Sequence, residues 1–219
     1  MEQFIVTIDG QAASGKSSIS KRAAAILGFQ HVDAGMLFRA MTLHLLRSGH
    51  DFKSDIPEEL LNGPIDVSFK DGKVYLHGDD VTNEVQGPAI TPHVIKLGSS
   101  ETFKQRVYGM ERALAKNRCT IFSGRDTGQV VFPNADVKFF VTASLEARAQ
   151  RRLKDYQALG KEVGGLKDVM DAIASRDAYD LENGSLVEPE NSIALDNSDD
   201  EFMDRVDMVV DVVKYAMDG

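Results

Sequence analysis

The stretch GQAASGKSS spans residues 10–18 and follows the apolar run FIVTI at residues 4–8, with only Asp9 between them. It satisfies the pattern G-x-x-x-x-G-K-[ST] in full. The apolar run is rich in β-branched residues and predicts a buried strand, and residues 19–27 carry apolar side chains at helical spacing. Strand, glycine-containing loop and helix, in this order, are the context in which the pattern forms a phosphate-binding loop.

The chemistry of this loop follows from its small residues. Glycines and other small side chains allow backbone N–H groups to surround a phosphate chain, and the start of the next helix adds a partial positive charge. Lys16 can reach the β- and γ-phosphates, and the Ser17 hydroxyl can ligate Mg²⁺. A chance match is expected in roughly 1% of chains of this length. The predicted phosphate-binding residues are Gly10, Ala12, Ala13, Ser14, Gly15, Lys16, Ser17 and Ser18.

The composition is that of an ordinary globular protein and narrows the functional classes. Of the 219 residues, 42% are hydrophobic and 27% are charged, which fits one domain or one domain with an insertion. The net charge of −9 argues against nucleic-acid or anionic membrane partners, because the field of the protein would repel both. With a single cysteine and no stretch long enough to span a membrane, we expect a cytoplasmic protein without an intrachain disulfide.

Further strands and helices alternate along the chain. Apolar runs predict strands at residues 29–33, 119–124, 137–144 and 192–197. The helical patterns between them imply an α/β fold with a doubly wound, parallel, five-stranded sheet flanked by helices. At residues 63–87 the pattern changes: hydrophobic and polar residues alternate on both sides of the hairpin-forming Asp71-Gly72 dipeptide, which predicts a small antiparallel insert.

Charged residues follow the predicted strands at their carboxyl ends, where ligands bind in sheets of this kind. Arg125 and Asp126 follow the third strand, and Arg148 and Arg152 share a face of the helix after the fourth. Phosphoryl transfer spreads negative charge over oxygens, so a kinase needs several cations around the transferred group. The chain lacks the Asn-Lys-x-Asp sequence of GTPases and the Ser-Gly-Gly-Gln sequence of transporter ATPases, which favours a kinase. The further candidates are Asp33, Gly35, Arg39, Arg176, Asp177 and Asp180.

These candidates also have purely structural interpretations. The two arginines on one helix face, Arg148 and Arg152, suit a solvated surface. Asp33 suits a helix N-cap. Arg125 and Asp126 suit a surface ion pair, although their place at the carboxyl end of a strand favours a functional role.

Five segments of the chain, taken in order, are similar to a known family. They are VTIDGQAASGKSS at residues 6–18, DAGMLFRA at 33–40, GRDTGQVVFPNADVKFFVTAS at 124–144, EARAQRR at 146–152 and RDAYD at 176–180. Together they span nearly the whole chain and resemble the bacterial cytidylate kinases, P-loop nucleoside monophosphate kinases. The third segment is the most specific of the five.

The resemblance implies an activity and a domain organisation. Members transfer the γ-phosphate of ATP to CMP or dCMP with Mg²⁺, giving ADP and CDP or dCDP, and are commonly monomers. Residues 1–219 would form a single nucleoside monophosphate kinase domain. Within it, about 63–95 would be an acceptor-side β insert and about 145–165 a helical lid over ATP.

The resemblance also implies roles for single residues. Lys16 and Ser17 would serve the ATP phosphates and the metal, and Asp126 would read the cytosine amino group. Arg148 and Arg152 would belong to the lid. The implied catalytic residues are Lys16, Arg125, Arg148 and Arg152. The implied acceptor-binding residues are Asp33, Gly35, Arg39, Lys104, Arg125, Asp126, Arg176 and Asp180.

Several positions depart from the family pattern, mostly on the acceptor side. The family usually has Thr or Ser where Ala34 stands, and often an acidic residue where Ser123 stands. Its base-reading arginine falls at Lys104, or alternatively at Arg106, and a further arginine falls at Asn183. Two alternatives therefore stay open: a kinase of this fold with another small acceptor such as UMP, and a nucleotide-binding protein with little catalysis.

Overall fold

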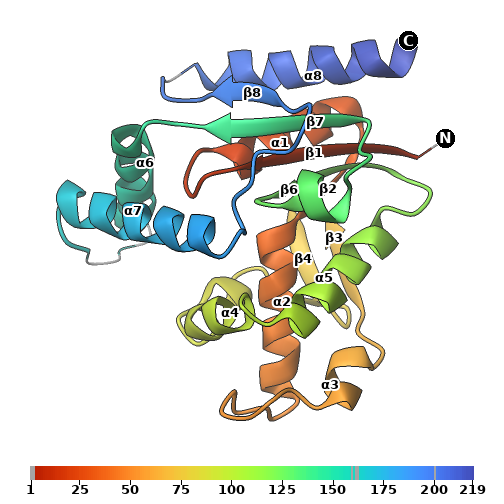
Figure 1. The fold of residues 1–219 in the computed structure, drawn as a ribbon, viewed down its shortest axis with the longest axis vertical. Helices are drawn as coiled ribbons and strands as arrows, with labels where there is room; N and C mark the ends of the chain where they lie inside the picture. Colours follow the sequence, from red (N-terminus) through yellow and green to blue (C-terminus); the bar gives the residue numbers. More distant parts are fainter. Residues whose placement is uncertain (1–2, 159, 161–162, 200) are drawn as a thin grey trace.

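The central element of the computed structural model is a parallel β-sheet (Figure 1). The structure describes residues 3–158, 160, 163–199 and 201–219. Within these residues the sheet has five strands in the order β2-β6-β1-β7-β8, which confirms the predicted α/β fold. The strands are β1 (Phe4–Gly10), β2 (Gln30–Asp33), β6 (Cys119–Gly124), β7 (Val137–Thr142) and β8 (Ile193–Asp196).

The register of the parallel strands aligns their carboxyl ends. Asp9 of β1 lies opposite Gly124 of β6, and Asp33 of β2 lies opposite Ser123 of the same strand. The phosphate loop leaves β1 at this edge, and residues 124–126 leave β6 beside it. Segments that are more than a hundred residues apart in sequence therefore meet at one edge of the sheet, as expected for ligand sites in this class of fold.

Two long helices cover one side of the sheet. Helix α1 (Lys16–Leu27) follows the phosphate loop, and α8 (Phe202–Asp218) closes the chain beside it (Figure 1). Their apolar faces bury Ile19 and Val209 against Ile8 and Val141 of the sheet. Gly28 ends α1 in the left-handed conformation at φ 71°, which glycine adopts without a steric penalty.

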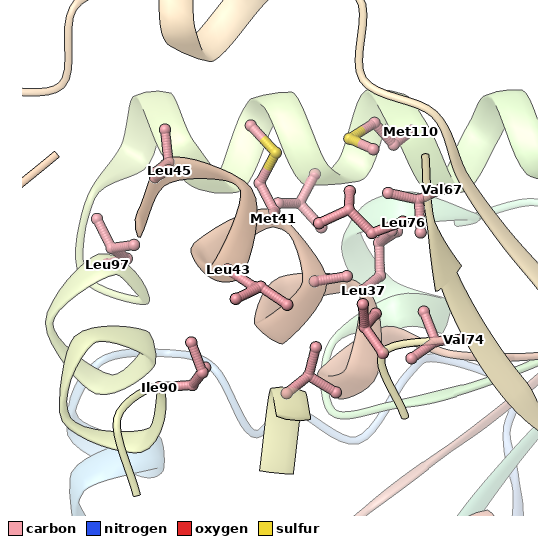
Figure 2. Close-up of a cluster of buried hydrophobic side chains, with 14 of the residues drawn as sticks. Leu37, Met41, Leu43, Leu45, Val67, Val74, Leu76, Ile90, Leu97 and Met110 are labelled. Atoms are coloured by element: carbon pink, nitrogen blue, oxygen red, sulfur yellow. The ribbon is translucent and has the colours of Figure 1, made fainter. Parts of the chain in front are cut away.

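A second apolar core lies under the antiparallel insert, in the lower half of Figure 1. The insert contains a three-stranded sheet, and Leu76 from it packs with Leu37 and Met41 of α2 and with Met110 of α5 (Figure 2). The insert therefore packs as one unit with the helices that flank it. The elements of this unit, insert and flanking helices together, are α2 (Ala34–Arg47), α3 (Glu58–Asn62), β3 (Val67–Lys70), β4 (Lys73–Leu76), β5 (Asp79–Asp80), η1 (Glu84–Gln86), α4 (Thr91–Leu97) and α5 (Glu101–Leu114).

The remaining helices lie where the strands β7 and β8 point (Figure 1). Helices α6 (Leu145–Ala158) and α7 (Leu166–Glu182) pack through Ala149, Val169 and Ile173. The predicted lid at 145–165 includes residues 159, 161 and 162, which lie outside the described residues. After β6 comes η2 (Thr127–Val131), a single π-helical turn that the sequence did not predict. No helix in the described residues is long and apolar enough to cross a membrane.

Candidate active site

A cavity of about 730 Å³ lies at the carboxyl edge of the sheet. Its walls come from the phosphate loop and from helices α2, α4, α5, α6 and α7. Its size is within the range of small-molecule sites. Twelve predicted site residues line it: Ala12, Lys16, Ser17, Asp33, Gly35, Arg39, Lys104, Arg125, Asp126, Arg152, Arg176 and Asp180. The predicted residues Gly10, Ala13, Ser14, Gly15, Ser18 and Arg148 do not line this cavity.

The phosphate loop is shaped by glycine at its two fixed positions. A Cβ on Gly10 would lie 2.1 Å from the carbonyl oxygen of Val141 on the neighbouring strand, which no side chain permits. Gly15 caps α1 in the left-handed region at φ 92° and offers no side-chain acceptor to the first N–H groups of the helix. The start of α1 is therefore suited to an anion. Lys16 Nζ donates to Gln11 O across the loop at 3.0 Å.

Partly buried cations raise the electrostatic potential of the cavity. Burial, together with the nearby charge of Arg125, lowers the pKa of Lys16 to about 8. Burial lowers the pKa of Arg125 to about 10, with Arg176 as the next cause. Like charges in a poorly solvated site disfavour one another, so an anionic group placed between them would be strongly stabilised.

A buried carboxylate holds two of these cations together. Asp180 forms ion pairs with Arg125 and with Arg176, whose Nε lies 3.1 Å from Asp180 Oδ1. Asp180 is almost completely buried, whereas the two arginine side chains are partly exposed to the cavity. The three residues come from the end of β6 and from α7, so this contact fixes α7 against the sheet.

Two further predicted arginines, Arg39 and Arg152, have partners outside this ion-pair cluster. Arg39 donates to Val85 O at 3.0 Å and to Thr91 Oγ1 at 3.2 Å, which links α2 to η1 and to the first residue of α4. Arg152 lies over the Tyr156 ring, with its guanidinium carbon 5.9 Å from the ring centroid. Both side chains line the cavity.

Arg148 occupies a different place from Arg152 on the same helix. It is buried, and its guanidinium donates to Ala12 O, to Ala143 O and to Asp177. It therefore fastens α6 to the phosphate loop and to α7. A solvated helix face, the structural alternative for this arginine, is excluded by its burial.

Asp9 is a site residue that sequence reasoning missed. Its carboxylate is buried at the end of β1 and accepts from the backbone N–H groups of Thr127 at 3.1 Å and Gly128 at 2.6 Å. Burial raises the pKa of Asp9 to about 6, against the lowering effect of these hydrogen bonds. The available signal was a carboxylate that ends an apolar strand directly before the loop. Asp9 ties residues 124–128 to the phosphate loop.

Asp33 satisfies both of its interpretations. It is the N-cap of α2, where Oδ1 accepts from Met36 N at 3.1 Å, and it also lines the cavity. The next residue, Ala34, lines the cavity as well.

The positions that depart from the family pattern differ in their surroundings. Lys104 lines the cavity, and its Nζ pairs with Glu101 at 3.0 Å. Arg106 instead donates to Leu61 O and Gly63 O and lies away from the cavity lining, so Lys104 is the better positioned of the two basic residues. Asn183 caps α7 and donates to the backbone of that helix.

Comparisons with known proteins agree on one family. A family model described as cytidylate kinase matches residues 6–215. A cytidylate kinase from Caldanaerobacter subterraneus is 34% identical over 206 residues, covering 92% of each chain. One from Thermotoga maritima is also 34% identical, covering 98% of each chain. A solved shikimate kinase from Bacteroides thetaiotaomicron has a TM-score of 0.53 at 12% identity, covering 97% of this chain and 99% of its own, and supports the fold alone.

The burial of Asp9 predicts how stability depends on pH. A pKa of about 6 in the folded chain, against 3.8 as the model-compound value, means that the folded state holds this proton more tightly than the unfolded state. The resulting stabilisation is present below pH 4 and is lost as the pH rises through about 6, by up to about 3 kcal/mol. Asn cannot ionise, so Asp9→Asn should gain stability relative to the wild type over this interval.

Urea unfolding followed by circular dichroism between pH 4 and pH 7 measures this difference. Asp218→Asn, at the exposed end of α8, is the matched control and should track the wild type. A stability difference between Asp9→Asn and wild type that does not change with pH would contradict the raised pKa of Asp9 in the folded chain.

Proposed function

The chain belongs to the cytidylate kinase family and transfers the γ-phosphate of ATP to CMP or dCMP, and we propose that the cavity at the sheet edge binds both nucleotides. The observation that carries the proposal is the meeting of Lys16, Arg125, Arg152 and Arg176 in one cavity with the carboxylate of Asp126. Several cations around one point suit a transferred phosphoryl group.

On the donor side, residues 10–18 bind the triphosphate of ATP. Backbone N–H groups at the start of α1 contact the phosphates, and the Lys16 ammonium group contacts the β- and γ-phosphates. An anion beside Lys16 restores the stability of its charged form, which burial and Arg125 otherwise weaken. Arg148 supports this side as a positioning residue, because it holds Ala12 O and Asp177 at once.

Mg²⁺ accompanies ATP in this proposal, with the Ser17 hydroxyl as its protein ligand. The described residues contain no cluster of three or more His, Cys, Asp or Glu side chains that could hold a metal. Ser17 lines the cavity beside Lys16, and a sparse protein contribution fits Mg²⁺, which keeps several waters and binds substrate phosphates. The ion would neutralise phosphate charge during transfer.

On the acceptor side, Arg39 and Arg125 hold the phosphate of CMP. Asp33, Gly35, Arg176 and Asp180 border this part of the cavity and contact the sugar or phosphate. Asp126 accepts from the N4 amino group of cytosine, which uracil lacks.

The runner-up acceptor is UMP, because Ala34 and Lys104 stand where the family has a hydroxyl and an arginine. Lys104 cannot make the planar, two-pronged contact of an arginine, and it is engaged with Glu101. Discrimination against uracil would then rest mainly on Asp126. We still place CMP first because the carboxylate is retained in the cavity.

Transfer requires a lysine in the phosphate loop. Lys16→Ala should lower kcat with CMP by about a hundredfold or more, since one electrostatic contact to the transition state contributes several kcal/mol. Coupled ADP release with CMP, dCMP, UMP, AMP and GMP measures both the loss and the acceptor preference. Lys214→Ala on the exposed face of α8 is the matched control.

Circular dichroism should show that Lys16→Ala is folded. Near-normal turnover of the folded Lys16→Ala variant would contradict the role of Lys16 in phosphoryl transfer. Faster turnover of UMP than of CMP by the wild type would contradict CMP as the preferred acceptor.

The missing hydroxyl at position 34 predicts a gain-of-function variant. Ala34→Ser places a hydroxyl in the cavity beside residues 124–126, and one neutral hydrogen bond is worth about 0.5–1.5 kcal/mol. The KM for CMP should fall about two- to tenfold. Titration of CMP and UMP under one set of conditions tests this, with Ala113→Ser on the exposed face of α5 as control. Unchanged values for both nucleotides would mean that position 34 does not face the acceptor.

We further propose that the segment from α6 to the start of α7 closes over bound nucleotides, because solvent at the γ-phosphate would favour hydrolysis over transfer. Tyr156, Val163 and Gly164 of this segment already border the cavity. Amide hydrogen exchange with and without a bisubstrate analogue should show added protection at residues 145–158. Equal exchange in both states would rule out closure.

A further inference from the structure

Tyr108 lines the cavity but has no role in the proposed binding of ATP, Mg²⁺ or CMP. It lies on α5, one turn beyond Lys104, and its hydroxyl donates to Asp126 Oδ2 at 2.5 Å. We propose that Tyr108 is a specificity-determining residue that positions Asp126 and keeps it an acceptor for the cytosine amino group. The inference rests on the proposed role of Asp126 in reading the base.

The position of Tyr108 is fixed by aromatic packing. Its side chain is 3% exposed, and its ring meets Phe38 edge to face at a centroid distance of 6.2 Å. Phe38 in turn packs edge to face on Phe103 of the same helix as Tyr108, at 5.8 Å. Phe38 and Tyr108 both line the cavity, so the hydroxyl is presented from a rigid apolar wall beside the acceptor base.

The hydrogen bond constrains one oxygen of Asp126 and directs the other. A carboxylate that already accepts from Tyr108 through Oδ2 cannot rotate freely about its terminal bond. The second oxygen is then held in one direction, which is the condition for reading a single exocyclic group. Lys104, which lies one turn before Tyr108 on α5 and also lines the cavity, is paired with Glu101, so α5 contacts Asp126 through the tyrosine.

Discrimination between cytosine and uracil depends on the protonation of Asp126. An ionised carboxylate accepts from the cytosine amino group and repels the uracil O4 carbonyl. A protonated carboxyl could donate to that carbonyl and would favour uracil instead. Burial raises the pKa of Asp126, and the hydrogen bond from Tyr108 acts in the opposite direction.

The charged groups around Asp126 belong to three elements. Tyr108 and Lys104 act on it from α5, and Arg125 acts from its own loop, all in favour of the ionised form. The acidic residues Glu111 of α5 and Asp9 of β1 interact with it as like charges. Removing the Tyr108 hydroxyl would leave the unfavourable influences in place, so Asp126 would hold its proton to a higher pH.

The test is Tyr108→Phe, which keeps the ring and removes only the donor. With saturating ATP, kcat and KM are measured for CMP and UMP from pH 6 to pH 8.5. Loss of a hydrogen bond to a charged acceptor should lower kcat/KM for CMP about tenfold at pH 7, mainly through KM. UMP should not lose activity, so the CMP/UMP ratio should fall about tenfold. The acid limb of the CMP profile should move to higher pH.

Two comparisons make the outcome decisive. Tyr215→Phe, 83% exposed on α8, should behave as wild type. Asp126→Asn alone should lower the CMP/UMP ratio, and adding Tyr108→Phe to it should lower the ratio little further, because the two residues act as a unit.

If Tyr108→Phe lowers kcat/KM equally for CMP and UMP and the acid limb of the CMP pH profile does not shift, then Tyr108 contributes packing only. This result would overturn the proposal. If Asp126→Asn changes the ratio but Tyr108→Phe does not, the base-reading role of Asp126 stands and the tyrosine proposal is wrong. If Asp126→Asn leaves the ratio unchanged, the base-reading assignment itself fails, and the tyrosine proposal fails with it.

Discussion

The parallel pairing of β1 with β6 places the two halves of the site next to each other. Because Asp9 lies opposite Gly124, the loop that leaves β1 and the loop that leaves β6 start from adjacent positions. The Asp9 carboxylate then holds the second loop by accepting from Thr127 N and Gly128 N. Burying a carboxylate is costly unless it is hydrogen-bonded, so this contact strongly favours one arrangement of the two loops.

The cations of the cavity depend on that frame. Arg125 extends from the loop that Asp9 holds, and Asp180 of α7 pairs with it and with Arg176. One buried carboxylate between two guanidinium groups leaves excess positive charge at the cavity surface. This charge disfavours ionised Lys16 in the free protein and would favour polyphosphate binding. The α6–α7 unit is attached to the same region through Arg148, which contacts both Ala12 O and Asp177.

Local sequence patterns were sufficient to predict the strands of the parallel sheet, the loop at residues 10–18 and the position of Lys16 and Arg125 in the cavity. These features depend on the spacing of hydrophobic residues, on the placement of glycines and on which residues follow the carboxyl end of a strand, all of which are local in the sequence. The burial of Arg148 could not be read from its polar helix, because its partners lie at Ala12, Ala143 and Asp177. Nothing in the sequence distinguishes Tyr108 from other aromatic residues on helices, because its partner Asp126 belongs to a different element and meets it only in the folded chain.

We propose that one cavity holds ATP on the β1 loop and the acceptor base at the β6 loop. A crystal structure of the chain with ADP and CMP would show both positions. We expect the ADP phosphates at residues 10–18, and the N4 amino group of CMP within hydrogen-bond distance of Asp126, with Tyr108 still donating to the same carboxylate. A CMP base placed elsewhere in the cavity, or phosphates bound away from Lys16, would contradict it.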